Sequence, residues 1–191
     1  MNIYATSVRL VCALIAVVIM VVMVPGALAT ENPGLHIQKA IPQTDLAGQG
    51  SFRWFGLKIY DAQLWVGPEG YDANQPLAEK FALDLHYARA LEGRKIAEAS
   101  EAQIAKLGIG TPEQRKGWLK EMIQLFPDVS DGTHLTGIYL PQQGTSFYLD
   151  GKQIGTIKDE DFSLAFFSIW LAPETSEPKL RNALLKNAVP H

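Results

Sequence analysis

The chain has 191 residues, of which 17 are lysine or arginine, 20 are acidic and one is cysteine. Its formal net charge of -3 is close to neutral, and the basic residues are spread among acidic ones. A domain that binds nucleic acid usually gathers positive charge on one face, so we expect no nucleic acid among its partners. The length suits one ordinary domain, which can bury a core without disulfides or a structural metal.

The first 29 residues have the pattern of a secretory signal peptide. A short, weakly basic segment leads into an apolar run from Leu10 to Val24, and Ala27-Leu28-Ala29 supplies the small residues of a cleavage site. The run is shorter than the roughly 20 apolar residues of a spanning helix, which favours cleavage over a retained anchor. Cys12, the only cysteine, lies inside this run, so we expect no thiol chemistry in the mature protein.

This pattern predicts a signal peptide over residues 1–29 and one mature domain over residues 30–191. The protein is then exported and periplasmic, and it meets the membrane only through the signal segment before cleavage. The mature domain contains no internal repeat or low-complexity tract that would indicate a second domain.

Strand patterns dominate the first half of the mature domain. Residues 36–41 predict a first strand, and the segment that follows, ending in Gly48-Gln49-Gly50, is prone to form a turn. Residues 52–66 are rich in aromatic and branched side chains and predict a strand. Their apolar side chains recur at odd-numbered positions from Phe55 to Ile59 and at even-numbered positions from Tyr60 to Val66. This change of parity requires a bulge, bend or turn between Gly56 and Asp61. Residues 81–87 alternate apolar and polar side chains, as a strand with one face on a core does.

Two helices follow these strands. Apolar residues recur at helical spacing from Ile96 to Leu107, and Gly108 ends this helix. The second helix opens with Thr111-Pro112-Glu113-Gln114, a capping box with proline at the first helical position, and Pro127 ends it. Residues 135–140 then predict another strand.

The last third combines a hairpin with two helices. Asp150-Gly151 between two short strand patterns predicts a tight turn, which requires positive φ angles. Asp159 can cap a helix that is apolar on nearly every side, and Pro178 lies in the first turn of a final helix. The order of strands, two helices, strands and two helices predicts an α+β domain, with helices packed on one face of a mainly antiparallel sheet.

Several of these segments resemble a known family. In the last third the positions are Phe126-Pro127-Asp128-Val129, Leu135-Thr136-Gly137, Phe147-Tyr148, Ile154-Gly155, Ala165-Phe166-Phe167, Ile169-Trp170-Leu171 and Leu180-Arg181; upstream they are Gly48, Gly50, Lys58-Ile59-Tyr60-Asp61-Ala62, Leu64-Trp65 and Tyr87-Ala88-Arg89. Together they resemble the bacterial chalcone isomerase-like domain over about residues 35 to 187. The resemblance implies an open-faced β-sandwich with a ligand cleft between sheet and helices. Some members close a chalcone to a flavanone, and others resemble fatty-acid-binding proteins without that activity.

The resemblance also implies candidate ligand-binding residues. In the family, a ligand-binding arginine follows two paired glycines, which match Gly48 and Gly50 here. An ungapped alignment puts Phe52 at the position of this arginine. Arg53 can therefore take the ligand-binding role only if a bulge intervenes. Tyr60 stands where the plant chalcone isomerase has a threonine, and the fatty-acid-binding branch of the family also has a tyrosine there. This difference weakens the case for an isomerase. Arg89 lies on the apolar face of its strand and is a third candidate.

Arginine and tyrosine side chains can hold a carboxylate through parallel hydrogen bonds or stabilise an oxyanion. The structural alternatives are an arginine at a strand end that reaches solvent and a core tyrosine.

The remaining chemistry-bearing residues predict no metal site and no cofactor. The four histidines lack metal-ligand spacing, and no serine has the context of a catalytic nucleophile. The preferred hypothesis is an exported protein that binds a small amphipathic ligand such as a fatty acid with little or no catalysis. One alternative is an intramolecular lyase of the chalcone isomerase type. Another is a cell-envelope interaction protein whose cleft is closed by side chains such as Phe166 and Trp170. The sequence leaves open whether the protein is an enzyme.

Overall fold

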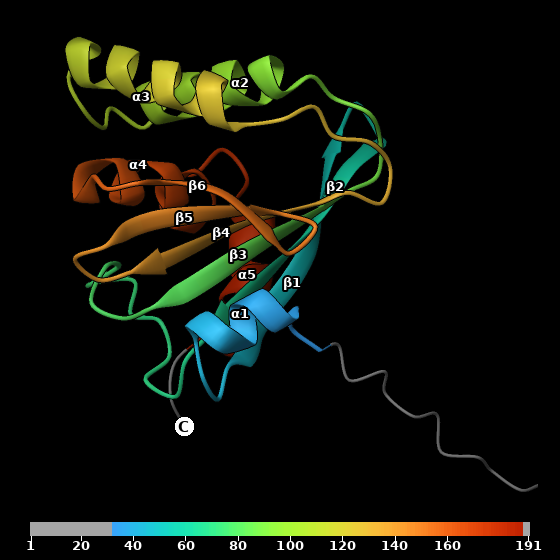
Figure 1. Cartoon of the computed structure of the whole chain (residues 1–191), viewed down its shortest axis with the longest axis vertical. Helices are drawn as coiled ribbons and strands as arrows, with labels where there is room; N and C mark the ends of the chain where they lie inside the picture. The colour runs from blue at the N-terminus through green and yellow to red at the C-terminus, as the bar shows by residue number, and fades with distance from the viewer. Residues whose placement is uncertain (1–31, 189–191) are drawn as a thin grey trace, which may run out of the picture. The chain divides into compact units, whose positions relative to one another are not determined.

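The computed structural model describes residues 32–188. Six strands form one antiparallel sheet in chain order: β1 (Asp45–Trp54), β2 (Leu57–Val66), β3 (Phe81–Tyr87), β4 (His134–Leu140), β5 (Gly144–Leu149) and β6 (Lys152–Ile157). The helices are α1 (Leu35–Ala40), α2 (Gly93–Lys106), α3 (Pro112–Leu125), α4 (Glu160–Leu171) and α5 (Pro178–Leu184). The described residues belong to one compact unit. The α+β fold predicted from the sequence is confirmed (Figure 1).

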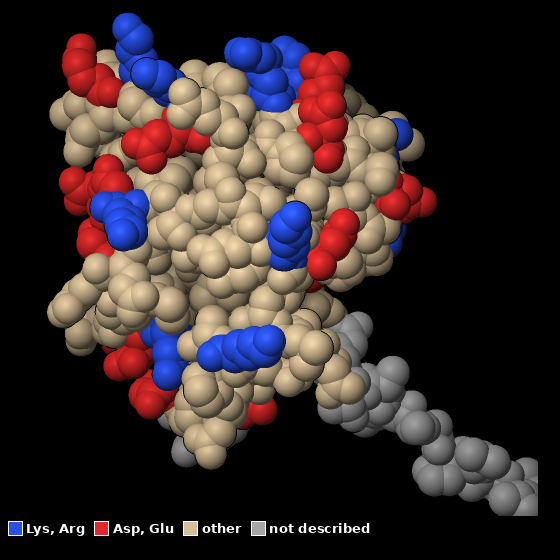
Figure 2. Space-filling view, viewed as in Figure 1, with Lys and Arg blue, Asp and Glu red and all other residues tan. Residues whose placement is uncertain are grey.

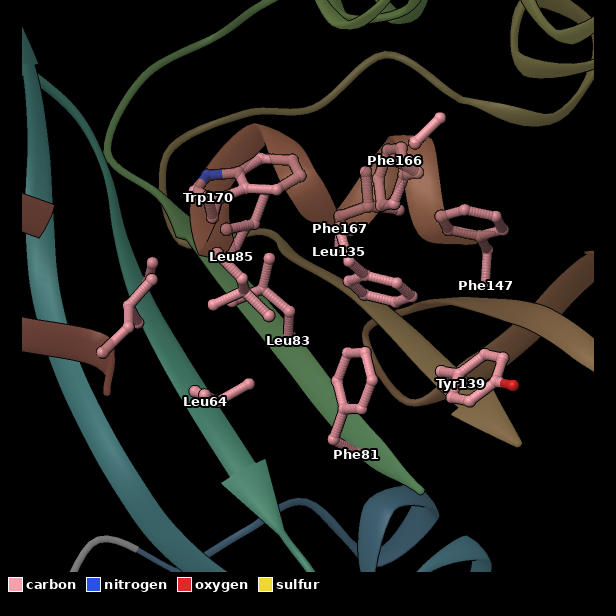
Figure 3. Close-up of a cluster of buried hydrophobic side chains, with 14 of the residues drawn as sticks. Leu64, Phe81, Leu83, Leu85, Leu135, Tyr139, Phe147, Phe166, Phe167 and Trp170 are labelled. Atoms are coloured by element: carbon pink, nitrogen blue, oxygen red, sulfur yellow. The ribbon is translucent and has the colours of Figure 1, made fainter. Parts of the chain in front are cut away.

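The inner face of the sheet, as we call the face that carries Leu64, Leu83 and Tyr139, holds the main core. Helix α4 packs on this face, and the pair α2 and α3 forms a further layer beyond it (Figure 1). Phe167 of α4 points toward the strands, and Phe166 lies among other buried aromatic side chains (Figure 3). The wide apolar surface of α4 is therefore explained by its position between two layers.

Local capping signals produce the predicted helix starts. Thr111 and Gln114 form the capping box at the start of α3, and the Asp159 carboxylate accepts a hydrogen bond from the Phe162 amide at the start of α4. The Asp150-Gly151 hairpin joins β5 to β6 as predicted. No helix among residues 32–188 is long and apolar enough to cross a membrane. The predicted signal peptide lies outside the described residues.

The predicted turn is confirmed at Pro42 and Gln43, but the Gly48-Gln49-Gly50 segment at its end belongs to β1. Gly48 and Gly50 do not bend the chain; each lies close to a residue of α5. A Cβ atom on Gly48 would lie 2.1 Å from the carbonyl oxygen of Ala183, and one on Gly50 would lie 2.8 Å from Leu180 Cδ1. The missing side chains let α5 approach the sheet backbone closely.

The strand predicted over residues 36–41 is also wrong, because these residues form most of α1. Ile37 and Ile41 are four residues apart and both are fully buried, which is helical spacing. They pack against Trp65, Ala82 and Ile138 on the opposite side of the sheet, which we call the outer face. This contact stabilises a helix that is too short to be stable alone.

Residues 52–66 form a hairpin instead of one strand. Phe55 and Gly56 occupy the turn with φ angles of 47° and 81°, and a register shift follows as Phe52 pairs with Tyr60 and Arg53 with Lys58. A turn with an adjacent bulge thus causes the change of parity seen in the sequence. The bulge at Ile59 lies inside the range predicted from Gly56 to Asp61, and the turn lies at the start of that range.

Candidate ligand-binding cavity

A cavity of about 490 Å³ lies between the inner face of the sheet and helices α2 and α4. Phe52, Tyr60 and Leu85 line it from the strands, Ile96 lines it from α2, and Trp170 lines it from α4. Small-molecule sites in proteins are usually cavities of this size with mostly apolar walls and a few polar groups. This cavity is therefore the first candidate for a binding site.

Family-signature residues hold α2 over the cavity. The Asp128 carboxylate accepts a hydrogen bond of 2.8 Å from the Gly93 amide at the start of α2. Val129 forms an isolated antiparallel bridge with Leu91 just before the helix. A Cβ atom on Gly93 would lie 2.1 Å from the carbonyl oxygen of Phe126, so the chain after α3 packs directly against this helix start. Asp128 and Val129 therefore fix the position of α2, which forms one wall of the cavity.

Tyr60 is the main polar group that the strands supply to the cavity. Its hydroxyl oxygen accepts a hydrogen bond of 3.0 Å from Trp170 Nε1, which joins the sheet to α4. The rings of Phe52 and Tyr87 lie 5.2 and 5.7 Å from the Tyr60 ring. Burial raises the pKa of the phenols of Tyr60 and Tyr87 well above their usual value. Both phenols are neutral at pH 7 and can donate a hydrogen bond to a ligand.

The two candidate arginines do not line the cavity. Phe52 faces it, whereas Arg53 is exposed and its Nη1 donates a hydrogen bond of 3.2 Å to the carbonyl oxygen of Gly56. A bulge does intervene, but its extra residue is Ile59 on β2, so Phe52 stays opposite Tyr60. Arg89 is half-buried and lies just beyond the end of β3. Of the three candidates, only Tyr60 lines the cavity.

The cations of the cavity come from α2, which the sequence analysis had not considered. Lys95 and Lys106 lie at the two ends of the α2 stripe that lines it, and Glu177, just before α5, lines it as well. Lys95 also forms an exposed ion pair of 2.8 Å with Glu98. The spacing of Lys95, Ala99, Gln103 and Lys106 along one helical face is the signal that could have identified this stripe.

Sequence comparison identifies the family. The sequence model of the family described as chalcone isomerase-like matches residues 35–186. The chain belongs to the chalcone isomerase-like family. An uncharacterized protein of Haemophilus influenzae is 30% identical over 138 residues, which are 72% of this chain and 66% of that protein. The chain thus spans slightly less than two thirds of that relative.

Structure comparison shows a likeness in fold to a solved structure. The crystal structure of a fatty-acid binding protein of Arabidopsis thaliana superposes with a TM-score of 0.62, covering 77% of this chain and 89% of that one. Sequence identity between the two is 14%, so this likeness shows the shared fold alone.

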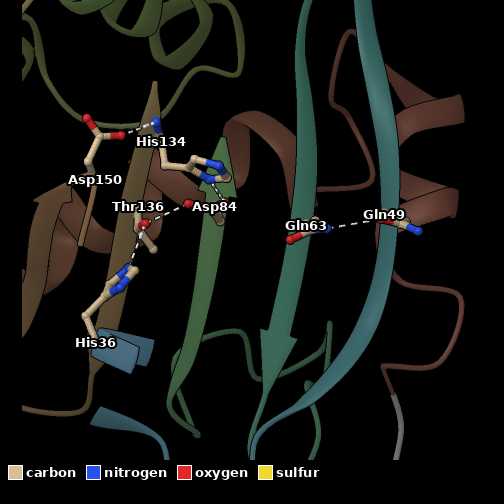
Figure 4. Close-up of polar contacts among 7 residues, drawn as sticks. All are labelled: His36, Gln49, Gln63, Asp84, His134, Thr136 and Asp150. Atoms are coloured by element: carbon tan, nitrogen blue, oxygen red, sulfur yellow. Dashed lines mark hydrogen bonds and ion pairs between the residues drawn. The ribbon is translucent and has the colours of Figure 1, made fainter. Parts of the chain in front are cut away.

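The outer face of this chalcone isomerase-like sheet carries a polar cluster that the sequence analysis missed (Figure 4). We call it the outer cluster; it consists of His36, Asp84, His86, His134 and Thr136. Asp84 accepts hydrogen bonds from Thr136 Oγ1 at 2.6 Å and from His134 Nδ1 at 2.7 Å, and His36 Nε2 lies 2.9 Å from Thr136 Oγ1. The rings of His86 and His134 stack at 4.3 Å.

A hollow of about 550 Å³ beside α1 borders the outer cluster. The carboxylate of Asp84 and the hydroxyl of Thr136 already bond to each other and to histidines of the cluster. Within residues 32–188, no group of three His, Cys, Asp or Glu side chains is arranged to hold a metal ion. We therefore favour the inner cavity, with its aromatic walls, as the ligand site.

Proposed function

We propose that this protein is an exported, non-catalytic carrier of a small amphipathic molecule such as a fatty acid, held in the cavity between the sheet and α2. The observation that carries this proposal is a mostly apolar cavity of about 490 Å³ whose polar groups include neutral phenols on the strands, lysines on α2 and Glu177 before α5. An alkyl chain buried there gains about 0.8 kcal/mol per methylene. A long-chain ligand would then survive gentle purification.

The polar end of the ligand is assigned to the α2 side of the cavity. Among the residues lining the cavity, the positively charged groups are Lys95 and Lys106. Phe52 occupies the position that the family resemblance gives to arginine, so a carboxylate finds no guanidinium beside Tyr60. Tyr60 can still donate its hydroxyl proton to an ester or carboxyl oxygen, because its oxygen already accepts from Trp170.

The isomerase alternative has less support than binding. Closure of a chalcone needs a cation or a set of donors that stabilises negative charge on oxygen in the transition state. The strands offer the phenols of Tyr60 and Tyr87, which stay protonated at pH 7 because burial raises their pKa values, so neither supplies a base. We expect no acceleration of chalcone closure above the uncatalysed rate, and a measurable rate that disappears in Tyr60→Phe would establish the enzyme instead.

The closed-cleft alternative is also disfavoured by the geometry. Phe166 and Trp170 form part of the cavity wall and do not fill its volume. Their rings lie 5.3 Å apart and pack on each other (Figure 3). The indole also donates a hydrogen bond to the Tyr60 hydroxyl. A pure interaction protein would not require this open volume.

The test is native mass spectrometry of the protein recovered from its own host, followed by organic extraction of anything bound. We expect a fatty acyl mass on the parent protein and a much weaker one on Ile96→Trp, which places an indole in the cavity. Ala102→Trp is the matched control, because Ala102 lies on α2 but is exposed and outside the cavity lining. Equal occupancy in both variants would refute the cavity as the site.

The same measurement tests export. The intact mass of the protein from the periplasm should correspond to a chain that begins at Thr30. A full-length mass in the membrane fraction would instead show that residues 1–29 are retained as an anchor.

A further inference from the structure

The tip of the β1–β2 hairpin concentrates the exposed apolar surface of the protein. Four large hydrophobic side chains are exposed among residues 32–188, and three of them lie in this tip: Trp54 at 59%, Phe55 at 89% and Leu57 at 55%. The indole of Trp54 and the ring of Phe55 meet edge to face at 5.0 Å and form an aromatic knob. We call residues 54–57 the hairpin tip.

Phe55 is in a backbone conformation that aromatic residues rarely adopt. Phe55 and Gly56 have φ angles of 47° and 81°, and Asp150 and Gly151 in the other hairpin have 47° and 80°. The two turns share one geometry, but Asp-Gly suits it and Phe-Gly does not. Since Phe55 is exposed, burial among the described residues does not offset the strain. Strain at an exposed aromatic residue points to a contact outside the chain.

Basic side chains flank the hairpin tip. Arg53 donates to the carbonyl oxygen of Gly56, which holds its guanidinium against the base of the turn. None of the ion pairs among the described residues includes Arg53, and Lys58 on the facing strand pairs with Asp61. Figure 2 shows lysines and arginines interspersed with acids on the face viewed. At the tip, an aromatic knob lies beside a guanidinium that belongs to none of these ion pairs. Such a pair matches a membrane interface, where rings enter the headgroup region and arginine meets phosphate.

The size and shape of the tip favour a lipid surface over a protein partner. The exposed parts of its three large side chains amount to about 400 Å², about half of what each partner buries in a stable protein interface. A two-residue turn is also a convex point, which a fluid bilayer accommodates without a complementary pocket. We propose that the hairpin tip inserts into the surface of a lipid bilayer that contains anionic headgroups.

The hairpin tip is continuous with the ligand cavity. Trp54 belongs to the tip and also lines the cavity, together with Phe52 and Ile59 of the same hairpin. Insertion of the tip would bring the cavity rim to the bilayer, where an amphipathic ligand could pass between the two. This last step rests on the proposed function, whereas bilayer binding by the tip does not.

Vesicle flotation tests the proposal with the chain from Thr30 to His191, which contains the whole compact unit and omits the apolar run of residues 10–24. We expect this protein to float with vesicles of phosphatidylcholine and phosphatidylglycerol. Trp54 reports insertion directly, because Trp65, Trp118 and Trp170 are buried at 2%, 3% and 6% exposure. Its fluorescence should shift to the blue and be quenched by lipids brominated in the acyl chains.

Phe55→Asn is the decisive variant. Asparagine suits the positive φ angle, so the variant should unfold at the same or a higher temperature than the parent. Its vesicle affinity should fall about tenfold or more, as expected when one phenyl ring no longer enters an apolar environment. The matched control is Leu35→Gln, which removes the other exposed apolar side chain, at 73%, and should bind vesicles as the parent does.

A parent protein that ignores vesicles, or a Phe55→Asn variant that binds them equally well, would overturn the proposal. Self-association that depends on Phe55 without vesicle binding would assign the tip to a protein contact instead. Flotation and fluorescence both use ligand-free protein. A cavity that is found to hold no ligand would contradict the proposed function, but it would not change the result of either vesicle assay.

Discussion

The Nδ1 atom of His134 lies 2.7 Å from Oδ2 of Asp84, and this ion pair joins β4 to β3 on the outer face of the sheet. The Asp84 side chain is only 7% exposed, whereas that of His134 is 44% exposed. The buried carboxylate therefore depends on its two partners, His134 and Thr136, for hydrogen bonds. The outer cluster thus links the protonation of histidine to the stability of the sheet.

The first prediction concerns the titration of two histidines of the outer cluster. The hydrogen bond to Asp84 raises the pKa of His134 above 6.5, while burial lowers the pKa of His36 below 6.5. NMR titration of the imidazole protons should therefore show His134 taking up its proton at higher pH than His36. Asp84→Asn should lower both pKa values, and Asp61→Asn is the control that leaves His134 unchanged. Identical titration of the two histidines in the parent protein would contradict this.

The second prediction concerns stability. Because the pKa of His134 is raised in the folded protein, its stabilising effect is complete below pH 6.5 and is lost as pH rises through the raised value. The free energy of unfolding of His134→Asn should therefore fall further below that of the parent at about pH 5.5 than at about pH 8. The difference in unfolding free energy between parent and variant should change by less than about 1 kcal/mol between these two pH values, since His134 is half-exposed. Urea denaturation at both pH values measures this difference. The same difference at both pH values would mean that the ion pair contributes nothing.

Local sequence signals predicted much of this fold. The Thr111 capping box, the Asp159 cap and the Asp150-Gly151 hairpin each depend on residues within a few positions of one another, and all are confirmed. Gly48 and α1 were misread for the opposite reason. The neighbour that requires a glycine at position 48 is the backbone at Ala183, and the residues that make a helix of α1 lie on distant strands.

The site was predictable only in part, because its residues are brought together by strand register. Tyr60 lines the cavity, and the change of parity placed an irregularity between Gly56 and Asp61, but parity alone could not identify Ile59 as the bulged residue. The outer cluster depends on the pairing of Asp84 with Thr136 and of His86 with His134 across β3 and β4. Residues about fifty positions apart give no periodic signal of such a pairing.

The third prediction tests the close approach of α5. Gly48→Ala places a methyl group where the carbonyl oxygen of Ala183 lies, so α5 must move away from β1. We expect a loss of about 1–3 kcal/mol in the free energy of unfolding. Gly117→Ala is the matched control, because a Cβ atom there meets nothing within 4 Å and alanine favours the helix α3. Thermal denaturation should show a lower midpoint for the first variant and an unchanged or higher one for the second.

The fourth prediction concerns the hydrogen bond between Tyr60 and Trp170. Tyr60→Phe keeps the ring contacts with Phe52 and Tyr87 but removes the acceptor of Trp170 Nε1, which is otherwise buried. The variant should lose about 1–3 kcal/mol of stability, the usual effect of leaving a buried donor unpaired. It should also retain less bound ligand, because the cavity loses a hydrogen-bond donor on its strand side. Tyr148→Phe on the outer face is the control for removing a tyrosine hydroxyl, and its ligand occupancy in native mass spectrometry should equal that of the parent. If Tyr60→Phe is as stable as the parent and carries the same ligand load, the Tyr60 hydroxyl has neither of these roles.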